Sequence, residues 1–248
     1  MSLMLYQALA GLLIFITSLI AVIYPLKMRS HPTHHHALEL GDALASGIFL
    51  GAALFHMLPD AVAGFSEVLP GWHYPLAELI CAGGFLLLLF FERLSQIHQK
   101  ESHLSLIIAV IITLHALIEG TALGVNTSFA AASVIFLAII AHKSSESFAL
   151  AVTLNRSTLP LRSVLIFIAL FALMTPLGIA LGAALTHSFN GVTQQILTAG
   201  FNAFAAGTFL YMSTLHHINH HHRTHDKESL WEFFVLVLGL GLMALLAS

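Results

Sequence analysis

The sequence predicts an all-α protein that crosses a membrane eight times, and three observations support this prediction. The chain has 248 residues, of which 58% are hydrophobic and only 8% are charged. An ordinary soluble domain carries about 25% charged residues, so these charges are too few to cover a soluble particle of this size. The hydrophobic residues form long uncharged blocks of about 20 residues, which is the length of a membrane-spanning helix. Third, lysine and arginine are concentrated in alternate connections between the blocks.

Eight apolar blocks give the expected helices, at residues 4–26, 38–58, 75–96, 104–125, 129–153, 161–187, 193–216 and 229–247. Each is long enough to cross a hydrocarbon core of about 30 Å at 1.5 Å per residue. We expect the first block to be a retained helix rather than a signal peptide, because its lysine, Lys27, follows the apolar run instead of preceding it. The whole chain, residues 1–248, is expected to form one transmembrane domain.

The lysine and arginine residues predict the orientation of the chain. Apart from Lys143, they occur as pairs at the first, third, fifth and seventh connections: Lys27 and Arg29, Arg93 and Lys100, Arg156 and Arg162, Arg223 and Lys227. The intervening connections and both termini contain none. Because cytoplasmic loops of membrane proteins are enriched in these residues, we expect both termini on the non-cytoplasmic side of a cell membrane.

A weak internal repeat predicts how the helices are related. Gly47-Ile48-Phe49-Leu50 precedes His56, and Gly207-Thr208-Phe209-Leu210 precedes His216 at the same spacing, although the two helices run in opposite directions. An inverted repeat of helices 1–3 and 6–8 would produce this pattern, and such repeats are common in transporters. Chance similarity in sequence rich in glycine and leucine is the alternative. The repeat would leave the fourth and fifth helices as a central pair.

The fourth and fifth helices carry ionisable residues near the middle of the membrane. His115 and Glu119 lie four residues apart in one helix, and His142 and Glu146 lie four residues apart in the next. Each pair therefore occupies one helix face. A charged group at the centre of a spanning helix costs about 3 kcal/mol on insertion scales, so these residues are expected to serve function. A buried His–Glu network that only braces the two helices is the structural alternative.

Two antiparallel helices with these faces opposed would present two imidazoles and two carboxylates to one point. This set of ligands suits Zn²⁺, and less selectively Fe²⁺, Mn²⁺, Co²⁺ or Cd²⁺. Lys143 follows His142, and its charge offsets one of the two carboxylates. We expect Lys143 to modulate the site, because an ammonium beside it repels a second metal ion. A lysine that reaches toward the cytoplasmic interface is the alternative.

These motifs resemble the ZIP family of divalent metal-ion transporters. The resemblance rests on His115-x-x-x-Glu119-Gly120 followed by His142 and Glu146, and on three further stretches: His56-Met57-Leu58-Pro59-Asp60, Thr175-Pro176-Leu177-Gly178 and Gly207-Thr208-Phe209-Leu210-Tyr211. It covers nearly the whole chain. It implies eight helices in a 3+2+3 arrangement that import a divalent metal into the cytoplasm, often as a homodimer.

The resemblance also bears on the number of metal ions. Family members with a two-metal centre typically carry Asn after the first histidine and an acidic residue after the second. This sequence has Ala116 and Lys143 at those positions. We therefore carry over only the first site, with His115, Glu119, His142 and Glu146 as ligands of a single ion.

Histidines gather near both expected mouths of the pathway. Seventeen histidines exceed the nine lysines and arginines together. The charge distribution places two clusters on the cytoplasmic side: His34, His35 and His36, and His216, His217, His220, His221 and His222. We expect these clusters to receive metal at a cytoplasmic exit, with solvated polar linkers as the alternative. His56 and Asp60 are expected at the entrance on the opposite side.

Transport of Zn²⁺ into the cytoplasm is the function that the sequence favours. The net charge of −3 offers no basic surface for nucleic acid, and the single cysteine, Cys81, excludes a disulfide framework. We expect no catalytic residue and no resident cofactor, the metal ion being the substrate, and we expect the lipid bilayer and a second copy of the chain as partners. A membrane-embedded zinc-dependent hydrolase is the main alternative, and a metal-gated sensor or passive channel is the third.

Overall fold

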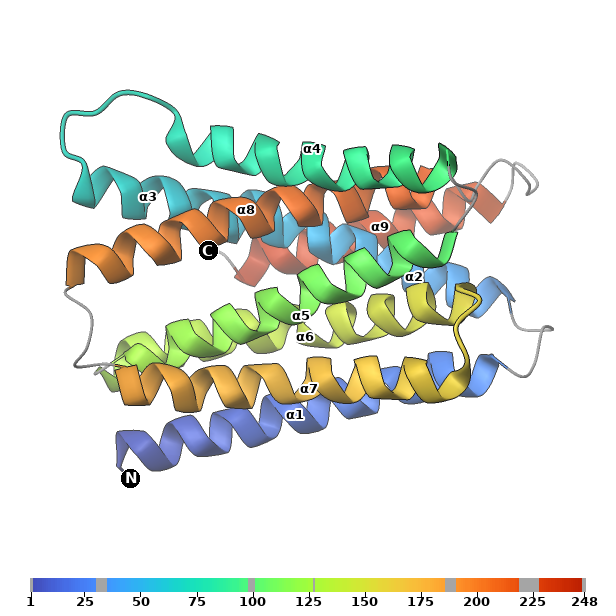
Figure 1. Ribbon diagram of the computed structural model, residues 1–248, viewed down its shortest axis with the longest axis horizontal. Helices are drawn as coiled ribbons and strands as arrows, with labels where there is room; N and C mark the ends of the chain where they lie inside the picture. The colour runs from blue at the N-terminus through green and yellow to red at the C-terminus, as the bar shows by residue number, and fades with distance from the viewer. Residues whose placement is uncertain are drawn as a thin grey trace. The chain divides into compact units, whose positions relative to one another are not determined.

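The computed structural model describes residues 2–29, 35–97, 101–126, 128–185, 191–218 and 228–246. These residues are almost entirely helical, with no strand among them (Figure 1). Within this part of the chain, six helical segments are long and apolar enough to cross a membrane: Leu3–Met28, Ala37–Val68, Ser105–Val125, Ala132–Asn155, Leu161–Leu185 and Gly191–Thr214. A shorter apolar helix covers Leu230–Leu246. The all-helical, multi-pass character predicted from the sequence is therefore confirmed.

Each of the eight predicted blocks overlaps one continuous helical segment. The helices are α1 (Leu3–Met28), α2 (His35–Ala52), α3 (Leu58–Val68), α4 (Leu76–Ile97), α5 (Glu101–Val125), α6 (Phe129–Arg156), α7 (Leu161–Leu185), α8 (Gly191–Ile218) and α9 (Glu228–Leu246). A π-helical turn, η2 (Ala53–Met57), joins α2 to α3, so these three elements make one segment.

The end of this second segment was predicted wrongly. The sequence places it at residue 58, just before Pro59, and assigns the following residues to a loop, whereas the helix continues to Val68. Proline has no N–H, and its ring crowds the carbonyl group four residues earlier. The wide turn η2 accommodates the ring, with the N–H of Leu58 bonded to the carbonyl of Ala53, five residues back. The helix therefore changes its hydrogen-bond pattern instead of stopping.

The first of two compact units contains α1, α5, α6 and α7. It comprises Met1–Ser30 and Gln99–Gly191. Helix α5 packs against α6 and α7, and α1 packs against the same two helices. A buried apolar cluster joins all four helices: Ala10, Ile14, Leu123, Ala132, Ile139 and Ile179. This unit therefore has its own core.

Glycines allow α5 and α7 to approach closely. Four of them line the contact: Gly120 and Gly124 on α5, and Gly178 and Gly182 on α7. A Cβ atom added at Gly120 would collide with the carbonyl oxygen of Thr175, and one added at Gly178 would collide with that of Leu117. Small residues four apart let helix backbones meet in a membrane. The contact fixes α5 against α7.

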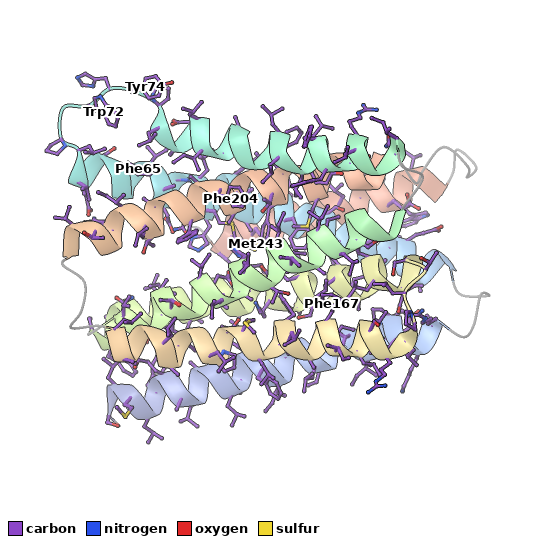
Figure 2. All side chains as sticks on the ribbon, viewed as in Figure 1. Phe65, Trp72, Tyr74, Phe167, Phe204 and Met243 are labelled. Carbon is purple, nitrogen blue, oxygen red and sulfur yellow. The ribbon has the colours of Figure 1, made fainter. Side chains whose placement is uncertain are left out.

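The second compact unit contains α2, η2, α3, α4, α8 and α9, from His31–His98 and Val192–Ser248. Gly47 of α2 lies against the backbone of α9 at Leu236, and Gly207 of α8 lies against the backbone of α4 at Cys81. The two glycines of the sequence repeat thus have matching roles. Figure 2 shows Trp72 and Tyr74 in the connection between α3 and α4.

Candidate metal centre

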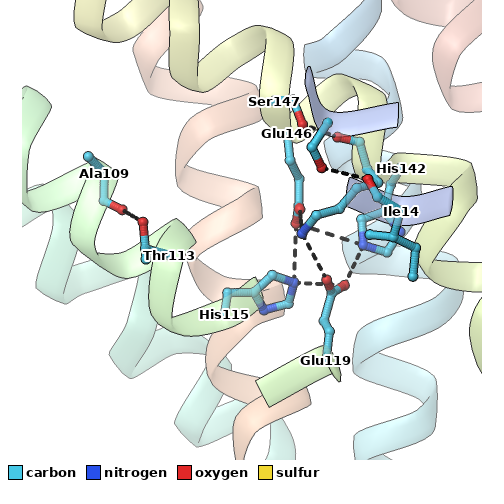
Figure 3. A network of polar contacts seen from close by, with 10 residues as sticks. Ile14, Ala109, Thr113, His115, Glu119, His142, Glu146 and Ser147 are labelled. Carbon is cyan, nitrogen blue, oxygen red and sulfur yellow. Dashed lines mark hydrogen bonds and ion pairs between the residues drawn. The ribbon is translucent and has the colours of Figure 1, made fainter. Parts of the chain in front are cut away.

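Four ionisable side chains converge in the interior of the first unit (Figure 3). His115 and Glu119 come from α5, and His142 and Glu146 come from α6. One ligand atom from each residue can be chosen so that all four atoms lie within 4.8 Å of one another. His142 and Glu146 have no exposed surface, and the side chain of Glu119 is 10% exposed. In the described part of the chain, the two helix faces therefore meet at one buried point.

The four nitrogen–oxygen distances in this group lie around the separation expected for ligands of one tetrahedral metal ion. Nε2 of His142 lies 2.6 Å from Oε1 of Glu119 and 3.8 Å from Oε1 of Glu146. Nε2 of His115 lies 3.0 Å and 3.3 Å from the same two oxygens. Two ligands of a zinc ion, each about 2.1 Å from it and separated by the tetrahedral angle, lie about 3.4 Å apart. The four N–O distances bracket this value.

One oxygen of this group is poorly satisfied by the protein. Oε1 of Glu146 is fully buried and accepts no hydrogen bond from the described residues, although Nε2 of His115 lies nearby. A buried carboxylate oxygen that lacks a hydrogen bond has lost its water without full replacement, which costs free energy. A cation held between the two imidazoles and this oxygen would satisfy it. The chemistry of the donor set therefore fits a divalent metal.

Lys143 lies beside the same two carboxylates. Its Nζ donates a hydrogen bond of 2.8 Å to Oε2 of Glu146 and lies 3.5 Å from Oε2 of Glu119. The side chain has no exposed surface, so the alternative that it reaches toward the cytoplasmic interface is wrong. Each carboxylate thus turns Oε1 toward the imidazoles and Oε2 toward the ammonium.

Phe171 is a neighbour of the site that sequence reasoning missed. Its ring lies on α7, and Nζ of Lys143 stands 4.4 Å from the ring centroid. The face of an aromatic ring attracts a cation, so Phe171 helps to hold the ammonium in place. One phenylalanine in a uniformly apolar helix gives no signal in the sequence. Only the packing of α7 against α5 and α6 reveals the contact.

Comparison with known proteins identifies the family. A family model described as "ZIP Zinc transporter" matches residues 4–105 and 98–247. The chain belongs to the ZIP family. The resemblance seen in the sequence is therefore confirmed. Members of this family are transporters, so the chain is a divalent metal transporter and not an enzyme, and the hydrolase alternative is set aside.

Several ZIP relatives are similar over most of their length. The chain is 29% identical to zinc transporter ZIP1 of Takifugu rubripes over 262 residues, which cover 87% of this chain and 86% of the relative. It is 29% identical to zinc transporter ZIP1 of Homo sapiens, and the match covers 83% of this chain and 79% of the relative. It is 24% identical to zinc transporter 3 of Arabidopsis thaliana, and the match covers 95% of this chain and 82% of the relative.

The residues that the sequence suggested for the mouths of the ZIP pathway lie outside the four-residue cluster. His56 in η2 and Asp60 in α3 belong to the second unit, where Nδ1 of His56 lies 3.0 Å from Oδ2 of Asp60 and both side chains are partly exposed. The predicted exit histidines are at or beyond the limits of the described structure. His35, His36, His216 and His217 lie at helix ends, with side chains outside the described residues, and His34, His220, His221 and His222 lie outside them altogether.

Proposed function

We propose that this ZIP protein carries Zn²⁺ into the cytoplasm through a single site formed by His115, Glu119, His142 and Glu146. The convergence of one donor atom from each of these four buried residues carries the proposal. Two imidazoles and two carboxylates, without a thiolate, suit a borderline ion such as Zn²⁺. Relatives named as zinc transporters support the same substrate. Fe²⁺, Mn²⁺, Co²⁺ and Cd²⁺ can use the same ligands with less selectivity.

The restriction to a single ion follows from the charges around the site. Two carboxylates and the ammonium of Lys143 give the empty group one net negative charge when the histidines are neutral. A bound divalent ion changes this to one net positive charge. A second divalent ion would then meet repulsion both from the first ion and from Lys143, whose Nζ lies 2.8 Å from Glu146.

The direction of transport and the route are part of the same proposal. The positive-inside pattern places the histidine clusters of the first and last cytoplasmic connections at the exit, and His56 with Asp60 at the entrance. We place both termini on the non-cytoplasmic side of the cell membrane. A homodimer is the assembly that the family resemblance favours.

An eight-helix, 3+2+3 arrangement with an inverted repeat completes the proposal. Such a repeat maps α1 onto α7 and α6 onto α5, so the contact between α1 and α6 corresponds to the contact between α7 and α5. In the same way, the contact between α2 and α9 corresponds to the contact between α8 and α4. The matching roles of Gly47 and Gly207 support it further. All four proposed ligands belong to one compact unit. That unit can therefore keep the ion coordinated while groups of helices move and expose the site first to one side of the membrane and then to the other.

Uptake by proteoliposomes loaded with a zinc-sensitive dye tests the function. The wild-type protein should fill the vesicles at a rate that saturates with Zn²⁺, and His115→Ala or Glu146→Gln should abolish filling. His73→Ala is the matched control, because His73 is an exposed histidine in the connection between α3 and α4. Filling that survives the loss of His115 would refute the four-ligand site. A sensor gives no filling, and a passive channel gives a rate that does not saturate.

A further inference from the structure

The side chain of Gln7 connects α1 to the end of α5. Gln7 is only 5% exposed, and its Nε2 lies 3.2 Å from the carbonyl oxygen of Leu123, 3.1 Å from that of Gly124 and 3.1 Å from that of Asn126. Helix α5 ends at Val125, so these carbonyls belong to its last turn and to the residue after it. The last carbonyl groups of a helix have no partner within the helix. Gln7 supplies the missing donors from another helix.

The chemistry of this contact is that of a helix cap. An amide nitrogen carries two hydrogens, and here three carbonyl oxygens surround it, so the nitrogen and not the oxygen of the Gln7 amide must face the helix end. The C-terminus is also the negative end of the helix dipole, which favours a donor there. Asn126 contributes a second amide, whose Nδ2 donates to the carbonyl of Ala122 at 2.7 Å. Within a membrane little water is available to donate hydrogen bonds to these carbonyls, so donors from the protein stabilise them.

The same helix, α1, is also tied to α6. Near one end of α1, the ring of Tyr6 packs against Phe129, with centroids 4.6 Å apart. Near the other end, Nδ2 of Asn155 on α6 donates to the carbonyl of Pro25 at 2.8 Å. Between them, Ile14 shares the buried cluster with Ile139 of α6. Helix α1 therefore links the two helices that carry the proposed ligands.

We propose that Gln7 is a positioning residue of the metal site. By holding the end of α5, it sets the height of His115 and Glu119 relative to the two ligands on α6. Leu123 follows Glu119 by four residues, about 6 Å along the helix axis, so a shift of the capped end moves Glu119 with it. The inference rests on the proposed function, because it takes these residues as the ligands. Residues that hydrogen-bond a metal ligand directly typically change metal affinity by about 10–100-fold when replaced, whereas Gln7 acts on its ligands through the helix.

Binding of Co²⁺ to the purified full-length protein tests this role, because its visible absorption reports the geometry of its ligands. Gln7→Leu removes the donors, and we expect about 10-fold weaker binding, the lower end of that range, and an altered spectrum. Gln7→Lys should keep both near wild type, because an ammonium offers three donors to three carbonyls at the negative end of a helix. Ser18→Ala is the matched control on α1, because the buried hydroxyl of Ser18 donates within its own helix, to the carbonyl of Ile14 at 2.9 Å, and has no other partner among the described residues.

Each outcome decides the question. A folded Gln7→Leu protein that binds Co²⁺ with wild-type affinity and spectrum would overturn the proposal, even if its thermal stability were lower, since Gln7 would then support only the fold. If Gln7→Leu does not fold, Gln7→Met, which nearly keeps the size and shape of the side chain but removes the donors, decides in its place: weakened Co²⁺ binding with an altered spectrum supports the role, and wild-type binding overturns it. Failure of the proposed function looks different, because wild-type Co²⁺ binding would then not depend on His115.

Discussion

Nζ of Lys143 donates a hydrogen bond of 2.8 Å to Oε2 of Glu146, while the other oxygen of that carboxylate faces the imidazole of His115 at 3.3 Å. One carboxylate thus stands between a fixed cation and the place proposed for a mobile one. Glu119 is arranged in the same way, with Oε2 toward Lys143 and Oε1 toward the imidazoles. The lysine offsets one of the two negative charges of the empty site in the membrane, where two uncompensated carboxylates would be very costly.

Replacing Lys143 with methionine should make the protein depend on metal for its stability. The change leaves two buried carboxylates without their counter-ion, and breaking a buried ion pair costs about 3–5 kcal/mol. A bound divalent ion restores the balance of charge, so the rise in melting temperature on adding Zn²⁺ should be larger than in the wild type. Thermal unfolding in detergent measures this, with Lys27→Met as the exposed control. An equal zinc-induced rise in Lys143→Met and wild type would contradict it.

The double variant Ala116→Asn with Lys143→Asp should bind a second metal ion. It replaces a cation that repels metal ions by a carboxylate that attracts them, and it adds an amide oxygen next to His115. The electrostatic attraction for a second ion and the number of available ligand atoms therefore both increase. Elemental analysis after dialysis against Zn²⁺ should give two ions per chain instead of one. Ala116→Asn alone keeps the ammonium and serves as the control, with one ion expected. A stoichiometry of one in the double variant would remove this account of the lysine.

The sequence allowed correct prediction of those features of the site that depend on a single helix. The spacing of His115 from Glu119, and of His142 from Glu146, fixes which side chains share a face, because the helical period is constant. The roles of Phe171 and Gln7 could not be predicted, because both depend on contacts between helices distant in the sequence. The end of the second block was predicted wrongly, because the apolar block ends at residue 58 whereas the helix continues past Pro59 to Val68 after a π-helical turn.

Acid should weaken uptake through competition at the histidines. A metal ion needs the free electron pair of Nε2 of His115 and His142, and a proton on that nitrogen removes it, so lower pH favours the protonated, metal-free site. Initial rates in proteoliposomes should fall, with a rising KM for Zn²⁺, between about pH 7 and pH 5. His73→Gln should keep this dependence, because His73 is an exposed histidine outside the cluster. A rate that stays flat over this range would speak against histidine ligation.

Replacing Gly120 with alanine should disturb both the fold and the site. The added Cβ would collide with the carbonyl oxygen of Thr175, which is backbone and cannot rotate away, so α5 must move from α7. Overpacking of this kind costs about 1–3 kcal/mol, and Glu119 moves with its neighbour. We expect a lower melting temperature and weaker Zn²⁺ binding. Gly83→Ala is the control, since an added Cβ there meets no atom within 4 Å. If Gly120→Ala were as stable and as active as Gly83→Ala, the close contact between α5 and α7 would have no part in holding the site.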